Sequence, residues 1–392
     1  MRIGDVHLGY CSNIHPAETW AQTQAVLEGP VAAVKARVAA HEDFGVGLRL
    51  SARAARELRA AGAGEVRTQL AASGMYVFSL NGFPYGPFHG EPVKAAVYRP
   101  DWREDERVAY THDLIAVLAD LLPEGEAGSI STVPGAFRTD VDPAGAEAIA
   151  ENLRRVAATL VELSRARGID IALALEPEPA CLLETTPEAV SFFGEHLVSA
   201  ASVSRFAAQI GSSAAEAETA LRRHLGVCLD TCHAAVEFED PAASVQSLRA
   251  AGISIAKLQA TTGLAIRPVT SETVAAVAAY ADDVYLHQTV ARHGETLTRY
   301  LDLPEAIAAF ESGAAADEWR VHFHIPVFEA EPTPFRNTQA FLAACLPAAI
   351  EAGCRHVEVE TYTWQVLPPT LRAEPVEDAI TRELTWTKER LP

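Results

Sequence analysis

The feature of this sequence that most constrains its fold is a repeated alternation of short apolar segments with longer segments of helical periodicity. The apolar segments predict strands at 6–11, 46–50, 76–80, 128–132, 171–176, 225–230, 253–259, 321–328 and 357–361. Helices are predicted between them, at 16–40, 52–72, 106–122, 143–166, 187–200, 214–223, 241–250, 304–311 and 338–352. Such alternation with short connections is typical of parallel strands joined by right-handed crossovers.

The number of these repeats favours a closed (β/α)8 TIM barrel over an open doubly wound sheet. The segment after the first strand, LGYCSNIHP, also lacks the G-x-G-x-x-G pattern of a dinucleotide-binding sheet. One strand exceeds what a barrel needs, and the surplus falls within 260–355. There, VYLHQTVARHGETLTRYL predicts a β-hairpin insertion at about 283–301, with its turn at His293–Gly294.

A second predicted insertion, at about 82–105, follows an early strand. It is a long loop rich in Gly, Pro and aromatic residues, and loops of this length are uncommon unless they cover a site. No linker or repeat divides the chain, so the sequence predicts one α/β domain over residues 1–392.

Composition narrows the classes of partner. A net charge of −20 disfavours nucleic acid and anionic lipid surfaces, although a local cleft can overrule the overall field. No segment reaches the roughly 20 apolar residues of a membrane span, and the N-terminus does not resemble a signal peptide. The six cysteines form no C-x-x-C pair. We expect a cytoplasmic protein with a small-molecule metabolite as its partner.

Polar side chains that can bind a metal stand at four predicted strand ends, which in a TIM barrel face the active site. They are Glu176, Asp230 with His233 one turn later, Gln259, and Glu360. Each alone has a simpler interpretation, because a strand-end carboxylate is more often solvated or capping the next helix. Their recurrence at several strand ends predicts a shared divalent cation, Mn²⁺, Mg²⁺ or Zn²⁺.

The order of these residues resembles the xylose-isomerase-like TIM-barrel superfamily, which holds sugar isomerases and epimerases and also endonuclease IV. The resemblance implies that Glu176, Asp230, Gln259 and Glu360 hold the metal. It also implies that His233 contacts substrate, as in the epimerases, or binds metal, as in the endonuclease branch.

One position departs from that pattern, because Gln259 stands where the superfamily usually has His. His322 and His324, in RVHFHIPVF, share a strand face and resemble the D-x-H pair of the endonuclease branch. They are candidates to supply the missing imidazole, His324 to the metal and His322 to the substrate. Two inward-facing core histidines are an equally good interpretation.

Six motifs together are similar to the EboE-type metabolite traffic proteins. They are YCSNIHPAETW, FGVGLRLS, FSLNGFPYGPFHG, YLHQTVAR, HFHIPVF and VEVETYTWQVLP, spread from residue 10 to 368. The resemblance implies a link to the movement of a prenylated or aromatic metabolite and defines no reaction.

Other residues are candidates to contact substrate. Asn81 and His89 flank the Gly/Pro/aromatic loop, where loop hydrogen bonding is as good an interpretation. Lys257 has the parity of Gln259 and is expected to point into the barrel. It is a candidate for Schiff-base chemistry or, more simply, for an ion pair with one of the carboxylates at the strand ends.

The leading prediction is a metal-dependent protein of the isomerase/epimerase type acting on a hydroxy-carbonyl or aromatic metabolite. Glu176 and Glu360 are its predicted proton-transfer pair, with His233 beside them. A non-catalytic metabolite carrier on the same barrel is the alternative from another class, since Gln259 weakens the metal set. An endonuclease IV-like phosphodiesterase and a Schiff-base aldolase at Lys257 are further hypotheses.

Overall fold

Parallel strands close into a barrel in the computed structural model, which describes residues 1–87, 89–90, 92–329, 331 and 334–392. The larger sheet runs in the order β1-β2-β14-β8-β7-β6-β5-β4-β3. Its parallel strands are β2 (Val6–Tyr10), β3 (Phe44–Arg49), β4 (Met75–Asn81), β5 (Gly128–Thr132), β6 (Ile171–Leu175), β7 (Leu225–Asp230), β8 (Ile255–Ala260) and β14 (His356–Val359). A parallel bridge from Cys11 to Gly47 joins β2 to β3 and closes the ring. The predicted TIM barrel is confirmed.

Burial explains why these segments form barrel strands. β2, β3, β5 and β7 are buried along their whole length, as expected for parallel strands with side chains on one face filling the barrel and helices covering the other. The short β1 (Arg2–Ile3) pairs antiparallel with β2 at the edge of this sheet.

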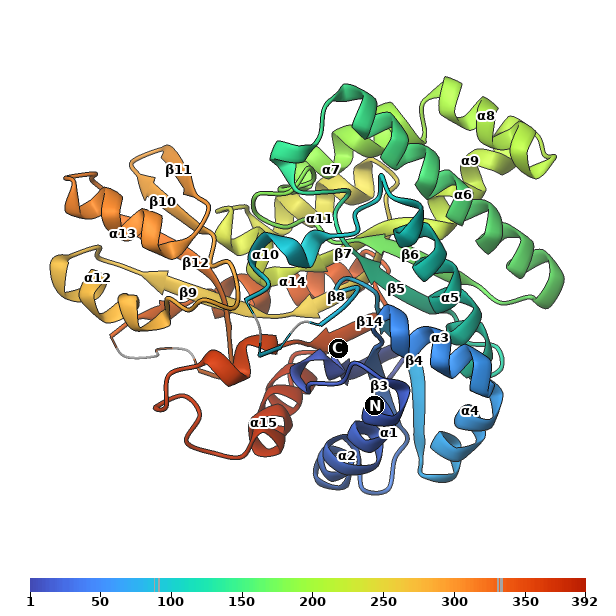
Figure 1. Cartoon of the computed structure of the whole chain (residues 1–392), viewed down its shortest axis with the longest axis horizontal. Helices are drawn as coiled ribbons and strands as arrows, with labels where there is room; N and C mark the ends of the chain where they lie inside the picture. The colour runs from blue at the N-terminus through green and yellow to red at the C-terminus, as the bar shows by residue number, and fades with distance from the viewer. Residues whose placement is uncertain (88, 91, 330, 332–333) are drawn as a thin grey trace.

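Helices follow the strands and cover the barrel (Figure 1). They are α1 (Trp20–Val26), α2 (Ala32–Val38), α3 (Ala52–Ala61), α4 (Ala63–Ala72), α5 (Asp105–Leu121), α6 (Pro143–Arg167), α7 (Thr186–Phe192), α8 (Ala200–Ile210), α9 (Ala214–His224), α10 (Thr231–Val236), α11 (Pro241–Ala250), α14 (Gln339–Glu351) and α15 (Val376–Lys388). The predicted helix at 52–72 is divided, because Gly62 has a φ of 94° that helical residues do not adopt. α8, α10 and α15 were not predicted.

The surplus strand belongs to a second sheet, which lies beside the barrel (Figure 1). Its order is β11-β10-β12-β9-β13, from β9 (Thr262–Ile266), β10 (Thr289–His293), β11 (Thr296–Tyr300), β12 (Glu318–Ile325) and β13 (Arg336–Asn337). The predicted hairpin is present as β10 and β11, turning at Gly294. The insertion is larger than predicted, because β9, β12, α12 (Ser271–Val277) and α13 (Leu303–Glu311) also lie in it, with an apolar core around Leu264, Trp319 and Phe323.

The predicted loop at about 82–105 is also present, between β4 and α5, and residues 88 and 91 lie outside its described part. Buried Arg107 holds its two ends together, donating to the carbonyl oxygens of Gly82 (2.7 Å), Phe83 (3.0 Å) and Pro100 (2.8 Å). The loop is therefore tied to the barrel.

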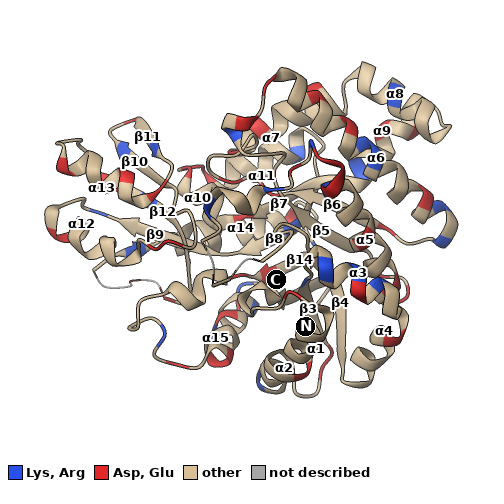
Figure 2. Cartoon of the chain, in the orientation of Figure 1, with Lys and Arg blue, Asp and Glu red and all other residues tan. Residues whose placement is uncertain are grey.

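Charged side chains are distributed over the helices of both the barrel and the insertion (Figure 2). Among the described residues, no helix has the length and apolar character to cross a membrane. The six cysteines are all buried and unpaired.

Candidate metal centre

Carboxylates from three barrel strands converge at the C-terminal end of the barrel. Glu176 follows β6, Asp230 ends β7, and Glu360 follows β14. Oxygen atoms of all three lie within 4.8 Å of one another, and all three side chains are buried. Gln259 of β8 stands between them in the ring, in register with Asp230. The strand order β14-β8-β7-β6 therefore brings together the four residues predicted to hold metal.

The two carboxylate oxygens of Asp230 have different surroundings. Its Oδ1 caps α10 by accepting from the backbone N–H of Cys232 (2.7 Å) and His233 (3.1 Å), and it also accepts from Thr261 Oγ1 (2.6 Å). Its Oδ2 is buried without a hydrogen-bond partner. The helix-cap interpretation and the ligand interpretation of Asp230 are thus compatible, because capping fixes the carboxylate and leaves one oxygen for a ligand.

Two histidines present their Nε2 atoms to Asp230. Nδ1 of His233 donates to the carbonyl oxygen of Pro177 (3.0 Å), and Nδ1 of His324 donates to that of Glu360 (2.8 Å). A carbonyl only accepts, so in the neutral ring Nε2 carries the lone pair, which is how metal-binding histidines are usually oriented. Both Nε2 atoms lie 3.9 Å from Asp230 Oδ2. Burial lowers the pKa of His324 to about 4, which keeps this ring neutral.

Several buried oxygen and nitrogen atoms around Asp230 have no hydrogen-bond partner. Among the described residues they include Glu176 Oε2, Asp230 Oδ2, His324 Nε2 and both amide atoms of Gln259. Leaving a buried polar group unsatisfied costs about 1–3 kcal/mol, more when it is charged. Glu176, Asp230 and Glu360 form one group of possible ligands within 4.8 Å of one another, and Asp230, His233 and His324 form a second, so these residues fit a divalent cation beside Asp230. Gln259 can offer its Oε1 only.

The carboxylates also repel one another. Burial, and then the neighbouring Glu360 and Asp230 carboxylates, raise the pKa of Glu176 well above its usual range. Burial and Asp230 raise the pKa of Glu360 to about 7. Glu360 Oε1 accepts hydrogen bonds from Asn13 Nδ2 (2.7 Å) and Asn81 Nδ2 (3.0 Å), which hold the side chain in place. Asn13 was not predicted as a site residue, although it lies in the motif YCSNIHPAETW.

Lys257 forms an ion pair beneath this centre. Its Nζ lies 2.9 Å from Glu358 Oε2, and neither side chain is exposed. The partner is thus Glu358 and none of the carboxylates considered from the sequence. Burial alone would lower the pKa of Lys257, but the Glu358 carboxylate raises it above its ordinary value. An ammonium held charged in this way is a poor Schiff-base nucleophile.

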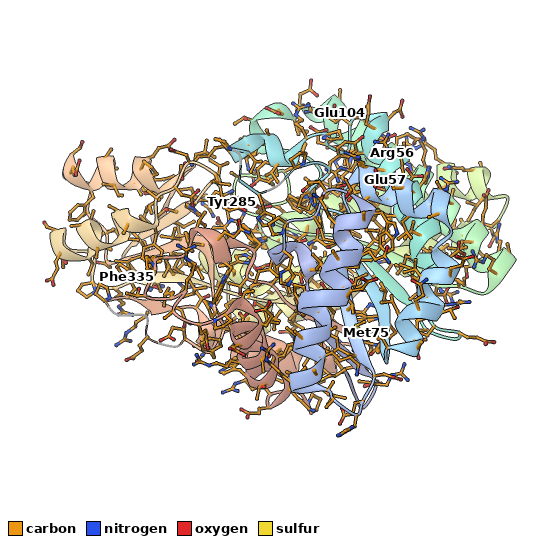
Figure 3. All side chains as sticks on the ribbon, turned by 60° about the horizontal axis from the view of Figure 1, so that its bottom comes forward. Arg56, Glu57, Met75, Glu104, Tyr285 and Phe335 are labelled. Atoms are coloured by element: carbon orange, nitrogen blue, oxygen red, sulfur yellow. The ribbon has the colours of Figure 1, made fainter. Side chains whose placement is uncertain are left out.

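A cavity opens next to the carboxylates. Its polar end includes Glu176, His233 and Glu360, together with Asn81 and His322. Its walls are largely apolar and aromatic, from Phe83, Val97, Tyr98, Leu286 and Tyr362 among others. Tyr285, also in the wall, lies where the insertion meets the barrel (Figure 3).

The remaining predicted substrate residues lie outside this lining. Lys257 is absent from it, and so is His89, whose Nε2 lies 2.5 Å from the carbonyl oxygen of Asn13. Loop hydrogen bonding is therefore the interpretation of His89 that the structure supports. Glu178, a carboxylate that was not predicted from the sequence, does line the cavity. Its position in LEPEP, two residues after Glu176, was the available signal.

No protein-family model and no curated protein matches the chain. Several solved structures are similar to it. A probable 3-DHS dehydratase, AsbF of Bacillus anthracis, is 11% identical with a TM-score of 0.46, over 97% of each chain. The IOLI protein with a bound zinc atom is 14% identical with a TM-score of 0.46, over 97% of this chain and 96% of that one. A xylose isomerase domain protein of Planctomyces limnophilus is 13% identical with a TM-score of 0.47, over 92% and 90%.

Proposed function

We propose that this protein is a metal-dependent enzyme of the sugar isomerase/epimerase type that acts on a small hydroxy-carbonyl compound. One observation carries the proposal. Buried atoms without hydrogen-bond partners on Glu176, Asp230 and His324 belong to two groups of possible metal ligands that share Asp230. Glu176, His233 and Glu360 of these groups line the cavity.

The residues that would hold the cation are Glu176, Asp230, Gln259 and Glu360, with His233 and His324 at its side. When bound, a divalent cation polarises the oxygens of a hydroxy-carbonyl ligand and makes the carbon between them more acidic. Glu176 and Glu360 both line the cavity, and burial raises the pKa of each carboxyl group, that of Glu360 to about 7. Such carboxyl groups suit proton removal and return at that carbon, with Glu176 on one side of the ligand and Glu360 on the other.

His233 would orient the ligand between these two carboxyl groups, because it lines the cavity and is fixed by Pro177. Aromatic side chains on the other walls, Phe83, Tyr98, Tyr285 and Tyr362, suit an aromatic or prenylated portion of the ligand. This wall supports the metabolite class that the EboE-type resemblance implies, and we include it in the proposal.

Metal analysis tests the central claim. We expect the purified protein, reconstituted with Mn²⁺ or Zn²⁺ and desalted, to retain a stoichiometric metal. Glu176→Ala and Asp230→Ala should each lower the affinity at least tenfold. Asp170→Ala is the matched control, because Asp170 precedes the same strand as Glu176 at the opposite end and binds Arg223. A wild-type protein without stoichiometric metal contradicts the proposal.

Isotope exchange tests turnover. In D₂O, the metal-loaded protein should exchange a carbon-bound proton next to the carbonyl group of its ligand. Proton NMR measures this exchange for each member of a panel of ketoses and aryl hydroxy-ketones. Glu360→Gln should abolish the exchange. Retained metal and ligand binding without any exchange would instead identify a metabolite carrier. A carrier is the second candidate function, because Gln259 stands where the superfamily usually has a histidine ligand.

A further inference from the structure

We propose that Glu178 and Tyr98, which line the cavity and are held in place by Gln288, form a second polar subsite that binds a hydroxyl group of an uncharged ligand and disfavours phosphate and carboxylate groups. The inference rests on the proposed function for the metal end of the cavity. It specifies in addition that the ligand is uncharged and that Glu178 binds the part of the ligand farthest from the metal.

A chain of hydrogen bonds fixes this subsite. His322 Nδ1 lies 2.8 Å from Gln288 Oε1, Gln288 Nε2 donates to Tyr98 Oη (2.9 Å), and Tyr98 Oη donates to Glu178 Oε1 (2.8 Å). Gln288 Nε2 also lies 3.2 Å from the carbonyl oxygen of Pro179, which can only accept, so the amide orientation is set. The chain therefore ends on the Glu178 carboxylate, a group that accepts hydrogen bonds.

The subsite adjoins the metal ligands. Ligand atoms of Glu178, His233 and His322 lie within 4.8 Å of one another, and His233 makes a second such group with Asp230 and His324. Glu178 and Glu176 both line the cavity. Glu178 is therefore separated from the metal ligand Asp230 by the imidazole of His233. A ligand bound at the metal can place a hydroxyl group where it donates a hydrogen bond to Glu178.

Among the described residues that line the cavity, no lysine or arginine is free to pair with an anionic ligand. Of the described residues that line it, Lys94 is the one lysine or arginine. Its Nζ donates to the carbonyl oxygens of Asp282 (2.8 Å) and Tyr285 (2.7 Å) and to Asp302 Oδ2 (2.7 Å). An ammonium has three N–H groups, so all of them are used within the protein.

The charged residues of the lining also disfavour an anionic ligand. Glu176, Glu178 and Glu360 are its carboxylates, while the charge of Lys94 is balanced by Asp302. Glu178 lies beyond the residues that would hold the cation, and among the described residues of the lining no free lysine or arginine faces it. A phosphate or carboxylate on the ligand would therefore lack a cationic side chain at this subsite.

Binding of paired probes tests this inference. The Mn²⁺-loaded protein is titrated calorimetrically with D-fructose and D-fructose 6-phosphate, and with D-glucitol and D-gluconate. We expect the neutral member of each pair to bind at least tenfold more tightly. An anionic member that binds equally well or better overturns the inference, and so does a panel in which neither neutral compound binds below about 50 mM.

Metal content measured on the same samples separates the two proposals. Loss of metal from the wild-type protein refutes the proposed function. Full metal content combined with a preference for the phosphate refutes the subsite alone.

Two variants test the residues. Glu178→Gln keeps the shape and removes the charge, so we expect a tenfold to hundredfold loss of affinity for the neutral probe, the usual effect of losing a hydrogen bond to a charged group. Discrimination against the anionic probe should shrink, and metal stoichiometry should not change. Tyr98→Phe should show a smaller loss, and it serves if Glu178→Gln fails to fold.

Glu184→Gln is the control, because Glu184 lies in the loop that also carries Glu178, contacts Arg138, and is outside the cavity lining. It should bind the probes as the wild-type protein does. Wild-type discrimination in both Glu178→Gln and Tyr98→Phe would remove the subsite.

Discussion

Lys257→Met should destabilise the protein severely, because it leaves Glu358 as an unpaired charge in the barrel interior. The two charged groups lie 2.9 Å apart with no exposure of either side chain. At an effective dielectric constant of 20, their attraction is about 6 kcal/mol. Glu358 is also tightly enclosed, since a Cβ placed on Gly47 would lie 2.2 Å from its Cδ, so water has little room to replace the ammonium.

Removing one partner of a buried pair usually costs about 3–5 kcal/mol, and we expect Lys257→Met to lower the free energy of unfolding by that amount. The double variant Lys257→Met/Glu358→Leu should recover most of this loss, because it no longer buries an unpaired charge.

Urea unfolding followed by tryptophan fluorescence and circular dichroism, in EDTA to remove any metal, measures both effects. Lys388→Met, at an exposed position, is the control and should change stability by less than about 0.5 kcal/mol. A Lys257→Met protein within about 1 kcal/mol of wild type would refute the reasoning. A double variant no more stable than the single variant would do the same.

Three further predictions concern single residues. Thr261→Val removes the 2.6 Å hydrogen bond to Asp230 Oδ1 and should weaken metal binding tenfold to a hundredfold in a chelator competition; unchanged affinity would show that Asp230 needs no such support. Burial raises the pKa of Glu383 from 4.5 to about 7, so the folded protein keeps a proton that the unfolded chain releases, and stability should fall by up to about 1.4 kcal/mol per pH unit between about pH 4.5 and 7. Glu383→Gln should remove that slope in melts across this range, and an identical slope in the variant would contradict the assignment. Borohydride with carbonyl compounds should not trap an adduct at Lys257 by peptide mass spectrometry, whereas a Lys257 adduct would restore the aldolase hypothesis.

Much of the barrel could be predicted from local pattern. The segments predicted at 128–132 and 225–230 coincide with β5 and β7, and the helix predicted from 143 begins there, where Asp142 caps α6 and Pro143 occupies its first turn. These features depend on burial periodicity and on capping residues, which act over a few residues. The candidate ligands at the strand ends could be predicted for the same reason, because parallel strands bring their C-terminal ends to one face.

The insertion could not be predicted in full. The apolar run at 321–328 looks the same whether it joins the barrel or another sheet, and only its antiparallel pairing with β9 and β10 places it in the second sheet. β9 follows β8 after one residue, so no turn signal separates the two strands in the sequence.

Side-chain partners were decided by the tertiary structure as well. Glu358 and Glu360 share one parity, and parity alone does not say which of them meets Lys257. The register of β14 against β8, with Glu358 opposite Gln259, puts Glu358 at the depth of the ammonium and Glu360 at the mouth of the barrel. The Glu178–Tyr98–Gln288 chain likewise joins segments 80 and 190 residues apart.

The sequence by itself thus determined the parallel barrel and the row of metal-capable residues at its strand ends, because both follow from periodicities of a few residues. The tertiary structure alone decided which oxygen of Asp230 remains without a partner, which carboxylate neutralises Lys257, and which polar groups face the ligand. Those outcomes depend on strand register and on loops that meet across the barrel mouth, and no local pattern encodes such distances.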